Sequence, residues 1–390
     1  MLKRPAFWLA FIVVSLAMAA AAYRAFPLAF SIVAVDISMD RAHALASARE
    51  LSARDHLGPA DFREAASFEL DDEAQTFVEL EGGGKDVFNA MLRDRLYVAY
   101  AWNVRHFREG EVNETTIILT PDGQPYGFSE KIKEDLPGAA LESDAARVIA
   151  ERGAPAWASD LSQYELVEHG QTRRSGGRID HTFTYERPSP ALGEGRYRLR
   201  LVVSGDRLTE VRHFVKVPEA FLRRYDSMRA ANTTLGLVAV IGMIVVYGIG
   251  GMGVGLFLMM RARWVLLRAA VMWGIGISAV QALVSVNEWP LVWMGYDTSV
   301  TRTLFVTQQS IAIVASLVGF SLIYTFSFMT AETLTRRAFG RHPQFWHVWR
   351  PRTGASVEIL GRTVAGYLLV TAFFAYDVGL YVFATHRLGW

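Results

Sequence analysis

The last third of the chain contains four long apolar stretches separated by short loops. They run Thr234–Met260, Trp264–Val286, Thr303–Met329 and Thr363–Thr385. Each is long enough to cross a bilayer, which takes about 20 mostly apolar residues in a helix. Hydrocarbon offers the backbone no hydrogen-bond partner, so a segment that crosses it must satisfy its own N–H and C=O groups. The sequence therefore predicts a bundle of membrane-spanning helices.

A further apolar run, Phe7–Ala22, follows two positive residues at the start of the chain. Its small residues resemble a signal-peptide cleavage site, so a cleaved leader and an uncleaved anchor both fit. Apolar residues resume soon after the run, which favours an uncleaved anchor over residues 1–35. Positive charge ahead of such a helix predicts a cytoplasmic N-terminus.

The composition divides the chain into two regions. Residues 36–230 are polar and charged like a soluble domain, although 51% of the whole chain is hydrophobic. The 40 basic and 39 acidic residues give a net charge of +1, which provides no general attraction to nucleic acid. There is no cysteine, which excludes disulfides, thiolate zinc sites and a cysteine nucleophile.

Residues 36–230 are predicted to contain two similar units, each with a helix, several strands and a final hairpin. The first unit, residues 36–135, begins at the helix-start signal Ser38-Met39-Asp40, and the second, residues 136–230, restarts at Glu142-Ser143-Asp144. The predicted strands are Ala65–Leu70, Gln75–Leu80, Leu96–Arg105, Thr115–Leu119, Gln124–Lys131, Tyr164–Glu168, His181–Glu186, Tyr197–Val203 and Leu208–Val217.

Each unit ends in a hairpin whose turn combines an acidic residue with glycine. These turns are Pro121-Asp122-Gly123 and Ser204-Gly205-Asp206. The helix-then-hairpin pattern resembles PepSY-type extracytoplasmic modules, and the resemblance implies peptidase regulation or binding rather than catalysis. Gly82-Gly83-Gly84 and Pro188–Gly195 are predicted loop insertions.

The predicted fold class is a membrane α-helical bundle plus an α+β extracytoplasmic domain with two similar helix-strand-hairpin units. Residues 231–390 form the four-helix transmembrane region, with a basic loop at 330–362. That loop is rich in arginine, whereas Asn287–Arg302 has a single one. The alternation predicts a multi-pass protein of the bacterial inner membrane, with residues 36–230 periplasmic or extracellular.

Gly248–Gly253 satisfies the spacing GxGxxG. A dinucleotide site needs that motif between a strand and a helix, whereas here it lies inside an apolar span without the acidic ribose ligand. We interpret the glycines as a helix-packing face, in which Gly251 and Gly255 allow a neighbouring helix to approach.

Asp377 is the one carboxylate near the middle of a predicted span. A charge there costs about 2.5–3.5 kcal/mol on insertion scales, so the side chain should face the bundle interior. It could serve a substrate or proton path, or it could be a neutral acid bonded to a neighbouring helix, which we favour. The candidate partners are Tyr367, Gln281, Gln308 and Gln309.

The nine histidines are scattered, and no HExxH pair occurs. His342 and His347 lie in the basic loop, where lipid headgroups or solvent are the expected contacts. The aromatic and basic segment Phe345–Arg350 is typical of a membrane interface. No catalytic, cofactor-binding or metal-ligating residue is assigned.

Two segments carry a second family resemblance. Ser327–Phe339 with the following His342-Pro343-Gln344-Phe345-Trp346, and Leu360–Thr385, are similar to the N-terminal membrane region of bacterial CAAX-protease and bacteriocin-processing (CPBP) intramembrane metalloproteases. The resemblance implies an accessory region of such a protease, with an outer domain that binds or regulates peptide. It covers about the last 170 residues.

The catalytic motifs of that family are missing from this chain. Its core carries EExxxR and two later histidine motifs that would hold a metal and activate water. Here Glu332 and Arg336 reproduce half of the first motif, but Ala331 replaces the first glutamate. Zinc or another divalent metal is therefore expected only if a catalytic core follows, and the end of the sequence at a span exit favours a fragment.

Two functions from different classes remain. The favoured one is the accessory, non-catalytic part of an intramembrane metalloprotease. The alternative is a non-enzymatic membrane sensor or scaffold whose outer domain binds a ligand or envelope partner. A transporter is a weaker third interpretation, because the spans contain no repeat and only one central acid. The expected partners are the lipid bilayer and a peptide or envelope protein, and no nucleic acid.

Overall fold

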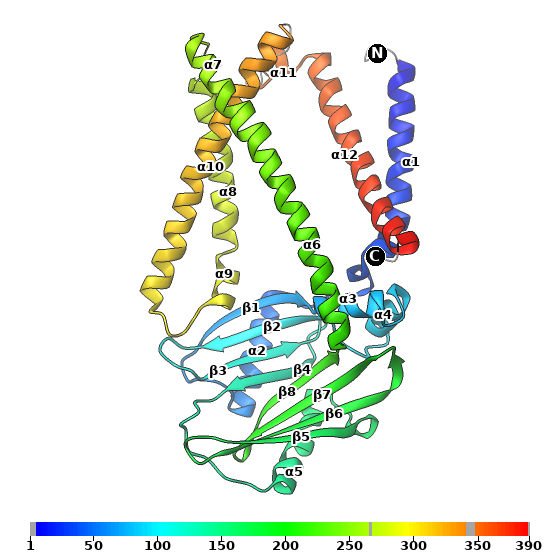
Figure 1. Cartoon of the computed structure of the whole chain (residues 1–390), viewed down its shortest axis with the longest axis vertical. Coiled ribbons are helices and arrows are strands. Elements are labelled where there is room, and N and C mark those ends of the chain that lie inside the picture. Colours follow the sequence, from blue (N-terminus) through cyan, green and yellow to red (C-terminus); the bar gives the residue numbers. More distant parts are fainter. Residues whose placement is uncertain (1–4, 265–266, 341–347, 389–390) are drawn as a thin grey trace. The chain divides into compact units, whose positions relative to one another are not determined.

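The computed structural model describes residues 5–264, 267–340 and 348–388 of the chain (Figure 1). The chain divides into two compact units. The helical unit contains Met1–Ala29, Tyr225–Glu288 and Val306–Trp390, and the sheet unit contains Phe30–Arg224 together with Trp289–Phe305. The sheet unit therefore includes a short segment that is remote in sequence, which we call the inter-span loop (residues 289–305).

Five helical segments of the described residues are long and apolar enough to cross a membrane, in agreement with the predicted multi-pass protein. The second of them, Glu219–Arg261, runs through α6, the π-helical η4 and α7. The helical elements are α1 (Pro5–Ala29), α6 (Glu219–Met243), η4 (Ile244–Val254), α7 (Gly255–Arg261), α8 (Leu267–Asn287), α10 (Arg302–Ala338), α11 (Pro351–Gly354), α12 (Val357–Phe383) and η7 (Ala384–Leu388).

The sheet unit is built on one eight-stranded antiparallel sheet with the order β1-β2-β3-β4-β8-β7-β6-β5. The last strand of each half, β4 or β8, lies in the middle, and the first strand of each half lies at an edge. The strands are β1 (Arg63–Leu70), β2 (Tyr100–Phe107), β3 (Glu114–Leu119), β4 (Pro125–Lys131), β5 (Glu165–Arg173), β6 (Ile179–Leu192), β7 (Gly195–Ser204) and β8 (Arg207–Lys216).

Short helices complete the sheet unit. They are η1 (Ser31–Ala34), α2 (Arg41–Asp55), α3 (Asp72–Leu80), α4 (Lys85–Arg93), α5 (Ser143–Gly153), η2 (Ala154–Trp157), η3 (Leu161–Gln163), α9 (Trp289–Val292) and η5 (Trp293–Gly295). The predicted helix start at Asp40 is an N-cap, because its carboxylate accepts the backbone N–H of His43 at 2.9 Å.

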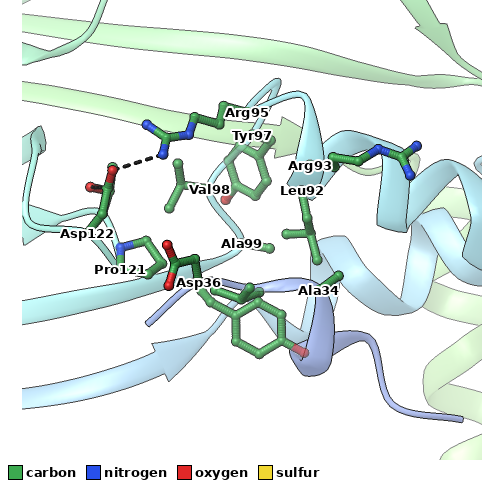
Figure 2. Close-up of a pocket in the computed structure, with 13 residues that line it drawn as sticks. Ala34, Asp36, Leu92, Arg93, Arg95, Tyr97, Val98, Ala99, Pro121 and Asp122 are labelled. Atoms are coloured by element: carbon green, nitrogen blue, oxygen red, sulfur yellow. Dashed lines mark hydrogen bonds and ion pairs between the residues drawn. The ribbon is translucent and has the colours of Figure 1, made fainter. Parts of the chain in front are cut away.

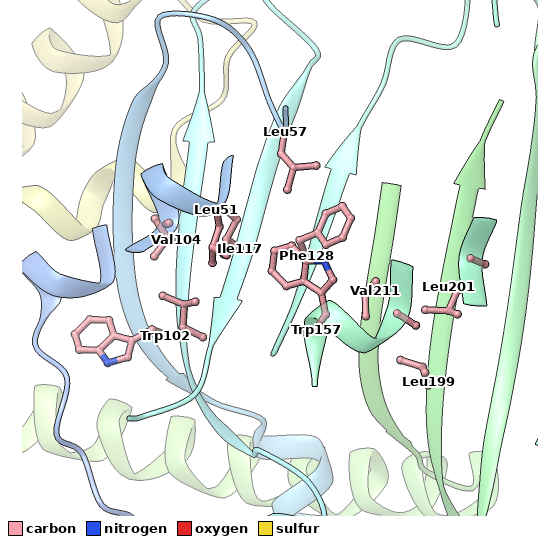
Figure 3. Close-up of a cluster of buried hydrophobic side chains, with 14 of the residues drawn as sticks. Leu51, Leu57, Trp102, Val104, Ile117, Phe128, Trp157, Leu199, Leu201 and Val211 are labelled. Atoms are coloured by element: carbon pink, nitrogen blue, oxygen red, sulfur yellow. The ribbon is translucent and has the colours of Figure 1, made fainter. Parts of the chain in front are cut away.

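One continuous hydrophobic core lies between the sheet and the helices α2 and α5. Figure 3 shows Val104 and Ile117 from the first half and Leu199 and Leu201 from the second in the same cluster. Alanines on both helices are fully buried against these strands, which lets the helices approach the sheet closely. The two halves therefore share one core, and we call this side of the sheet the helix face.

The two halves join through a short seam between β4 and β8. Only Phe128 and Ser129 pair across it, with Val211 and Glu210. Gly127 adjoins this pairing, and a Cβ atom there would lie 2.4 Å from the carbonyl oxygen of Val211. The close approach of the two backbones therefore requires glycine.

Two strand predictions and one loop prediction were wrong in detail. Residues 75–80 belong to helix α3, because Asp71 caps its N-terminus, and Phe77 and Val78, three and four residues after Ala74, bury one apolar face with it. Strand β2 begins at Tyr100 rather than at Leu96. Most of the predicted loop insertion Pro188–Gly195 continues strand β6, which ends at Leu192.

Candidate functional site

The inter-span loop binds to the first half of the sheet through Arg105 of β2. The Arg105 Nη1 group donates hydrogen bonds to the carbonyl oxygens of Met294 at 3.0 Å and Tyr296 at 2.7 Å. The backbone N–H of Gly110 donates to the carbonyl of Thr298 at 2.8 Å. The Arg105 guanidinium also pairs with Glu114, which holds its orientation. These bonds attach the loop that connects α8 to α10.

Aromatic side chains also pack between the inter-span loop and the sheet. Phe107 is fully buried, and its ring centroid lies 5.5 Å from that of Tyr296 and 6.3 Å from that of Trp293. The Arg63 guanidinium lies 5.4 Å from the Trp293 ring centroid, within the range of a cation–π contact. Side chains alternate between faces along a strand, so Arg105 and Phe107 point away from the helix face that Val104 occupies. The loop therefore packs on the opposite side of the sheet.

A cleft of about 200 Å³ lies between the segment that follows η1 and the hairpin turn after β3 (Figure 2). Asp36 lines it together with the ion pair between Arg95 and Asp122, whose Nη2–Oδ2 distance is 2.9 Å. The Tyr97 hydroxyl donates to Asp71 at 2.5 Å, and burial raises the pKa of this phenol well above its usual value. The phenol therefore stays neutral at physiological pH.

A second cleft, of about 270 Å³, opens at the end of the β4–β8 seam, on the helix face. We call it the seam cleft, and it is lined by Asp94, Arg95, Leu96, Tyr126, Ala158, Asp160, Gln163, Tyr164, Arg187 and His213. Tyr126 and His213 lie across the seam with stacked rings whose centroids are 4.3 Å apart. Arg95 lines both clefts, so the two adjoin at this residue.

His213 is a neutral side chain at the wall of the seam cleft. Burial lowers its pKa to about 4. Its Nε2 atom lies 3.1 Å from the Ser159 hydroxyl, but that serine is only 2% exposed and donates to the carbonyl of Trp157. A buried hydroxyl cannot reach a substrate, so this serine–histidine pair positions the residues after α5 and does not form a nucleophilic site.

The predicted intramembrane residues lie apart from these clefts, in the helical unit. Asp377 lies in α12. Within the described chain, its side chain forms no hydrogen bond with the suggested partner Gln281. A Cβ atom on Gly255 would lie 2.8 Å from the Thr330 Cγ2 atom of α10. For Gly251, the only atom within 4 Å of that position is the carbonyl oxygen of Val246 in the same helix.

Glu332 of α10 is buried and accepts a hydrogen bond from the Arg336 Nε atom at 2.7 Å. Among the described residues, no group of three or more His, Cys, Asp or Glu side chains is arranged to hold a metal ion. Two histidines, His169 and His181, have ring nitrogens 3.1 Å apart. His342, His347 and the first half of the predicted interfacial segment fall in 341–347, outside the described residues.

Sequence analysis named the turn residues Pro121 and Asp122 of the first cleft, but it did not single out Arg105 or Arg187. Arg105 and Met294 are separated by almost half the chain, and only the folded sheet brings them together. Arg187 lay beside a segment that we predicted to be a loop. Comparison of the chain with protein-family models, curated proteins and solved structures finds no match.

Proposed function

We propose that the protein is a non-enzymatic membrane receptor, in which the sheet unit binds a small ligand and passes its state to the membrane helices. The observation that carries the proposal is the pair of hydrogen bonds from Arg105 to the carbonyls of Met294 and Tyr296. The inter-span loop is continuous with α8 at Asn287 and with α10 at Arg302. A change in the sheet can therefore act on the ends of two helices.

Two further chain connections support this coupling. The segment after α1 lines the cleft of Figure 2, and β8 leads into α6 through residues 217–218. Four of the five candidate spans thus begin or end at a segment of the sheet unit. A catalytic role needs reactive groups within reach of substrate, whereas the clefts are lined by groups suited to binding.

The orientation forms part of the proposal. A loop that packs on the sheet must lie on the same side of a membrane as the sheet. Spans that alternate in direction bring residues 289–305 to that side. Arginine-rich loops on the other side favour a cytoplasmic location for residues 330–340 and an extracytoplasmic one for the sheet unit. We further propose that the two halves are duplicated units, since each contains a helix followed by four strands of the sheet.

The CPBP and PepSY resemblances give the competing proposal, an accessory region of an intramembrane protease whose outer domain binds peptide. Glu332 and Arg336 carry part of its support, because they match half of the family's first motif. The Arg336 Nε atom lies 2.7 Å from Glu332, so this carboxylate has a cationic partner without a metal. We therefore prefer the receptor, and the protease relation stays a prediction.

The receptor proposal is tested by measuring whether the sheet controls the loop and the helix beyond it. The chain has no cysteine, so Ser299→Cys and Ser310→Cys each give a single attachment site for a nitroxide spin label in nanodisc-embedded protein. Both serines are exposed. We expect Arg105→Ala to increase label mobility at position 299 and to change the spectrum at position 310.

Arg108→Ala is the matched control, since this exposed arginine is nearby but makes its contacts with Ala60 and Glu111 instead of the loop. It should leave both spectra unchanged. If Arg105→Ala mobilises the label at position 299 but leaves position 310 as in the parent protein, the loop is docked without coupling. That result would refute the receptor proposal.

A further inference from the structure

Arg187 differs from the other charged residues that line the seam cleft, because it has no partner in the described chain. Arg95 pairs with Asp122, and Asp94 lies 3.8 Å from Arg93. Asp160 accepts hydrogen bonds from the backbone and hydroxyl of Ser162 and from Gln163. The Arg187 Nε–H group is buried without an acceptor, and the side chain forms no ion pair within 4 Å.

The strand register places this arginine on the helix face of the sheet. Arg187 pairs with Tyr197, two residues beyond the pair of Tyr185 with Leu199, and both of those residues belong to the hydrophobic core. Residues two apart on a strand share a face. A guanidinium at the margin of an apolar core is costly without an acceptor, because each buried unsatisfied donor loses its hydration.

The walls around Arg187 offer further neutral donors and no competing anion in contact with it. The Tyr126 hydroxyl accepts the backbone N–H of Val98 at 3.2 Å, which leaves its own proton available for donation. Burial raises the pKa of Tyr126 and of Tyr164, so both phenols stay protonated. Hydrogen bonds from Ser162, and then from Gln163, lower the pKa of the neighbouring Asp160 carboxyl, and the charge of Arg187 adds a smaller effect. Asp160 is therefore already held by Ser162 and Gln163.

We propose that the seam cleft binds a small organic carboxylate whose oxygens take up the free donors of Arg187. The planar guanidinium matches a carboxylate in a two-bond arrangement, and the tyrosine and histidine rings contact the ligand's body. A volume of about 270 Å³ accommodates a molecule the size of an aromatic acid. The inference rests on the proposed receptor function, for which it names the ligand class.

The test uses the full chain in a non-ionic detergent, with benzoate as the probe. Saturation-transfer NMR detects benzoate bound to the protein, and inorganic phosphate is added as a competitor at constant ionic strength. We expect saturable benzoate binding that phosphate displaces only at a higher concentration. If phosphate displaces benzoate at a concentration below that at which benzoate half-saturates the protein, the carboxylate assignment is overturned.

Substitutions at the cleft separate specific recognition from general attraction. Arg187→Gln should weaken benzoate binding at least tenfold, and Arg187→Lys should weaken it less, because lysine keeps the charge but not the fork of donors. Arg212→Gln is the matched control, since Arg212 is an exposed neighbour of His213 on β8 that does not line the cleft. It should change the affinity less than twofold.

Tyr126→Phe provides a second variant should Arg187→Gln fail to fold, and it should weaken binding about threefold by removing one donor. Equal affinity in the parent protein, Arg187→Gln and Tyr126→Phe would refute the site, as would the absence of saturable binding to the folded parent chain. Either failure leaves the spin-label result at positions 299 and 310 unaffected. The site and the receptor coupling can therefore fail separately.

Discussion

The two halves of the sheet differ on the face that points away from α2 and α5. In the first half this face is covered by the inter-span loop, and both Ala65 and Phe107 are fully buried beneath it. In the second half the same face carries a ladder of ion pairs. Arg198 Nε lies 3.0 Å from Glu186 and Arg200 Nε lies 2.7 Å from Glu210.

Two halves with similar strands therefore carry different side chains on this face, and only the first half binds the inter-span loop. The paired side chains of the second half are partly exposed, and ion pairs at such a surface contribute about 0–1 kcal/mol each. A buried aromatic and an arginine that binds backbone carbonyls instead hold a partner segment firmly. The first half is thus the half bound to the membrane-connected loop, and charged side chains occupy this face in the second half.

The largest expected effect is on the aromatic contact of the first half. Phe107→Ala should destabilise the sheet unit by about 3–5 kcal/mol, because it leaves a cavity beside Trp293 and Tyr296. It should also accelerate hydrogen exchange of the amides in residues 289–305. Thermal unfolding and hydrogen–deuterium exchange of the full chain in detergent measure the two effects.

Phe214→Ala is the matched control in the second half. Phe214 pairs with Arg198 and therefore points to the same face, but it is only partly buried. We expect a loss below about 1 kcal/mol and no change in the exchange of the loop. Equal losses for the two substitutions would mean that the loop adds nothing to the first half, and the comparison would fail.

Hydropathy predicted the spans, because a bilayer demands apolar residues over a fixed length. It did not predict the helix ends, since α6 begins at Glu219, 15 residues before the apolar stretch at Thr234. Strand alternation identified most of the sheet but failed at α3, where three of the six residues 75–80 are of types that favour strands. Local pattern cannot decide such cases, because the burial of Phe77 depends on tertiary contacts.

The candidate site was less predictable than the fold for a physical reason. An arginine in a sequence gives no sign of whether a carboxylate will pair with it, and Arg105, Arg187 and Arg200 look alike on alternating strands. Their different roles follow from the order of the strands, which places Glu210 in an ion pair with Arg200, whereas no acid of the described chain forms an ion pair with Arg187. The family resemblances concern other residues and stay predictions.

On the helix face of each half, one histidine has a pKa that burial lowers, and this predicts acid sensitivity. Burial lowers the pKa of His106 and of His213 to about 4, below the usual 6.5. As the pH falls from about 6.5 to 4, the unfolded chain binds protons that the folded chain cannot accept. Stability is therefore complete above pH 6.5 and decreases through this window, by up to about 3 kcal/mol for each histidine.

Melting temperatures of the parent protein between pH 7.5 and 4.5 test this linkage. His106→Gln and His213→Gln should each flatten the profile, whereas His43→Gln, at an exposed side chain, should not. The carboxyls with lowered pKa, such as Glu114, lose their contribution only below their usual value of about 4.5. A profile that stays flat from pH 6.5 to 4.5 in the parent protein would rule out buried neutral histidines in both halves.

The smallest effect concerns the seam that joins the halves. Gly127→Ala would put a methyl carbon 2.4 Å from the Val211 carbonyl oxygen, and the backbone must move to relieve the overlap. We expect the free energy of unfolding to fall by about 1–3 kcal/mol and the β4 and β8 amides to exchange faster.

Gly170→Ala on β5 is the control, because no atom lies within 4 Å of its Cβ position. It should be neutral in the same unfolding measurement. If Gly127→Ala is equally neutral, the halves are joined mainly by their shared core, and the seam cleft can widen without separating them.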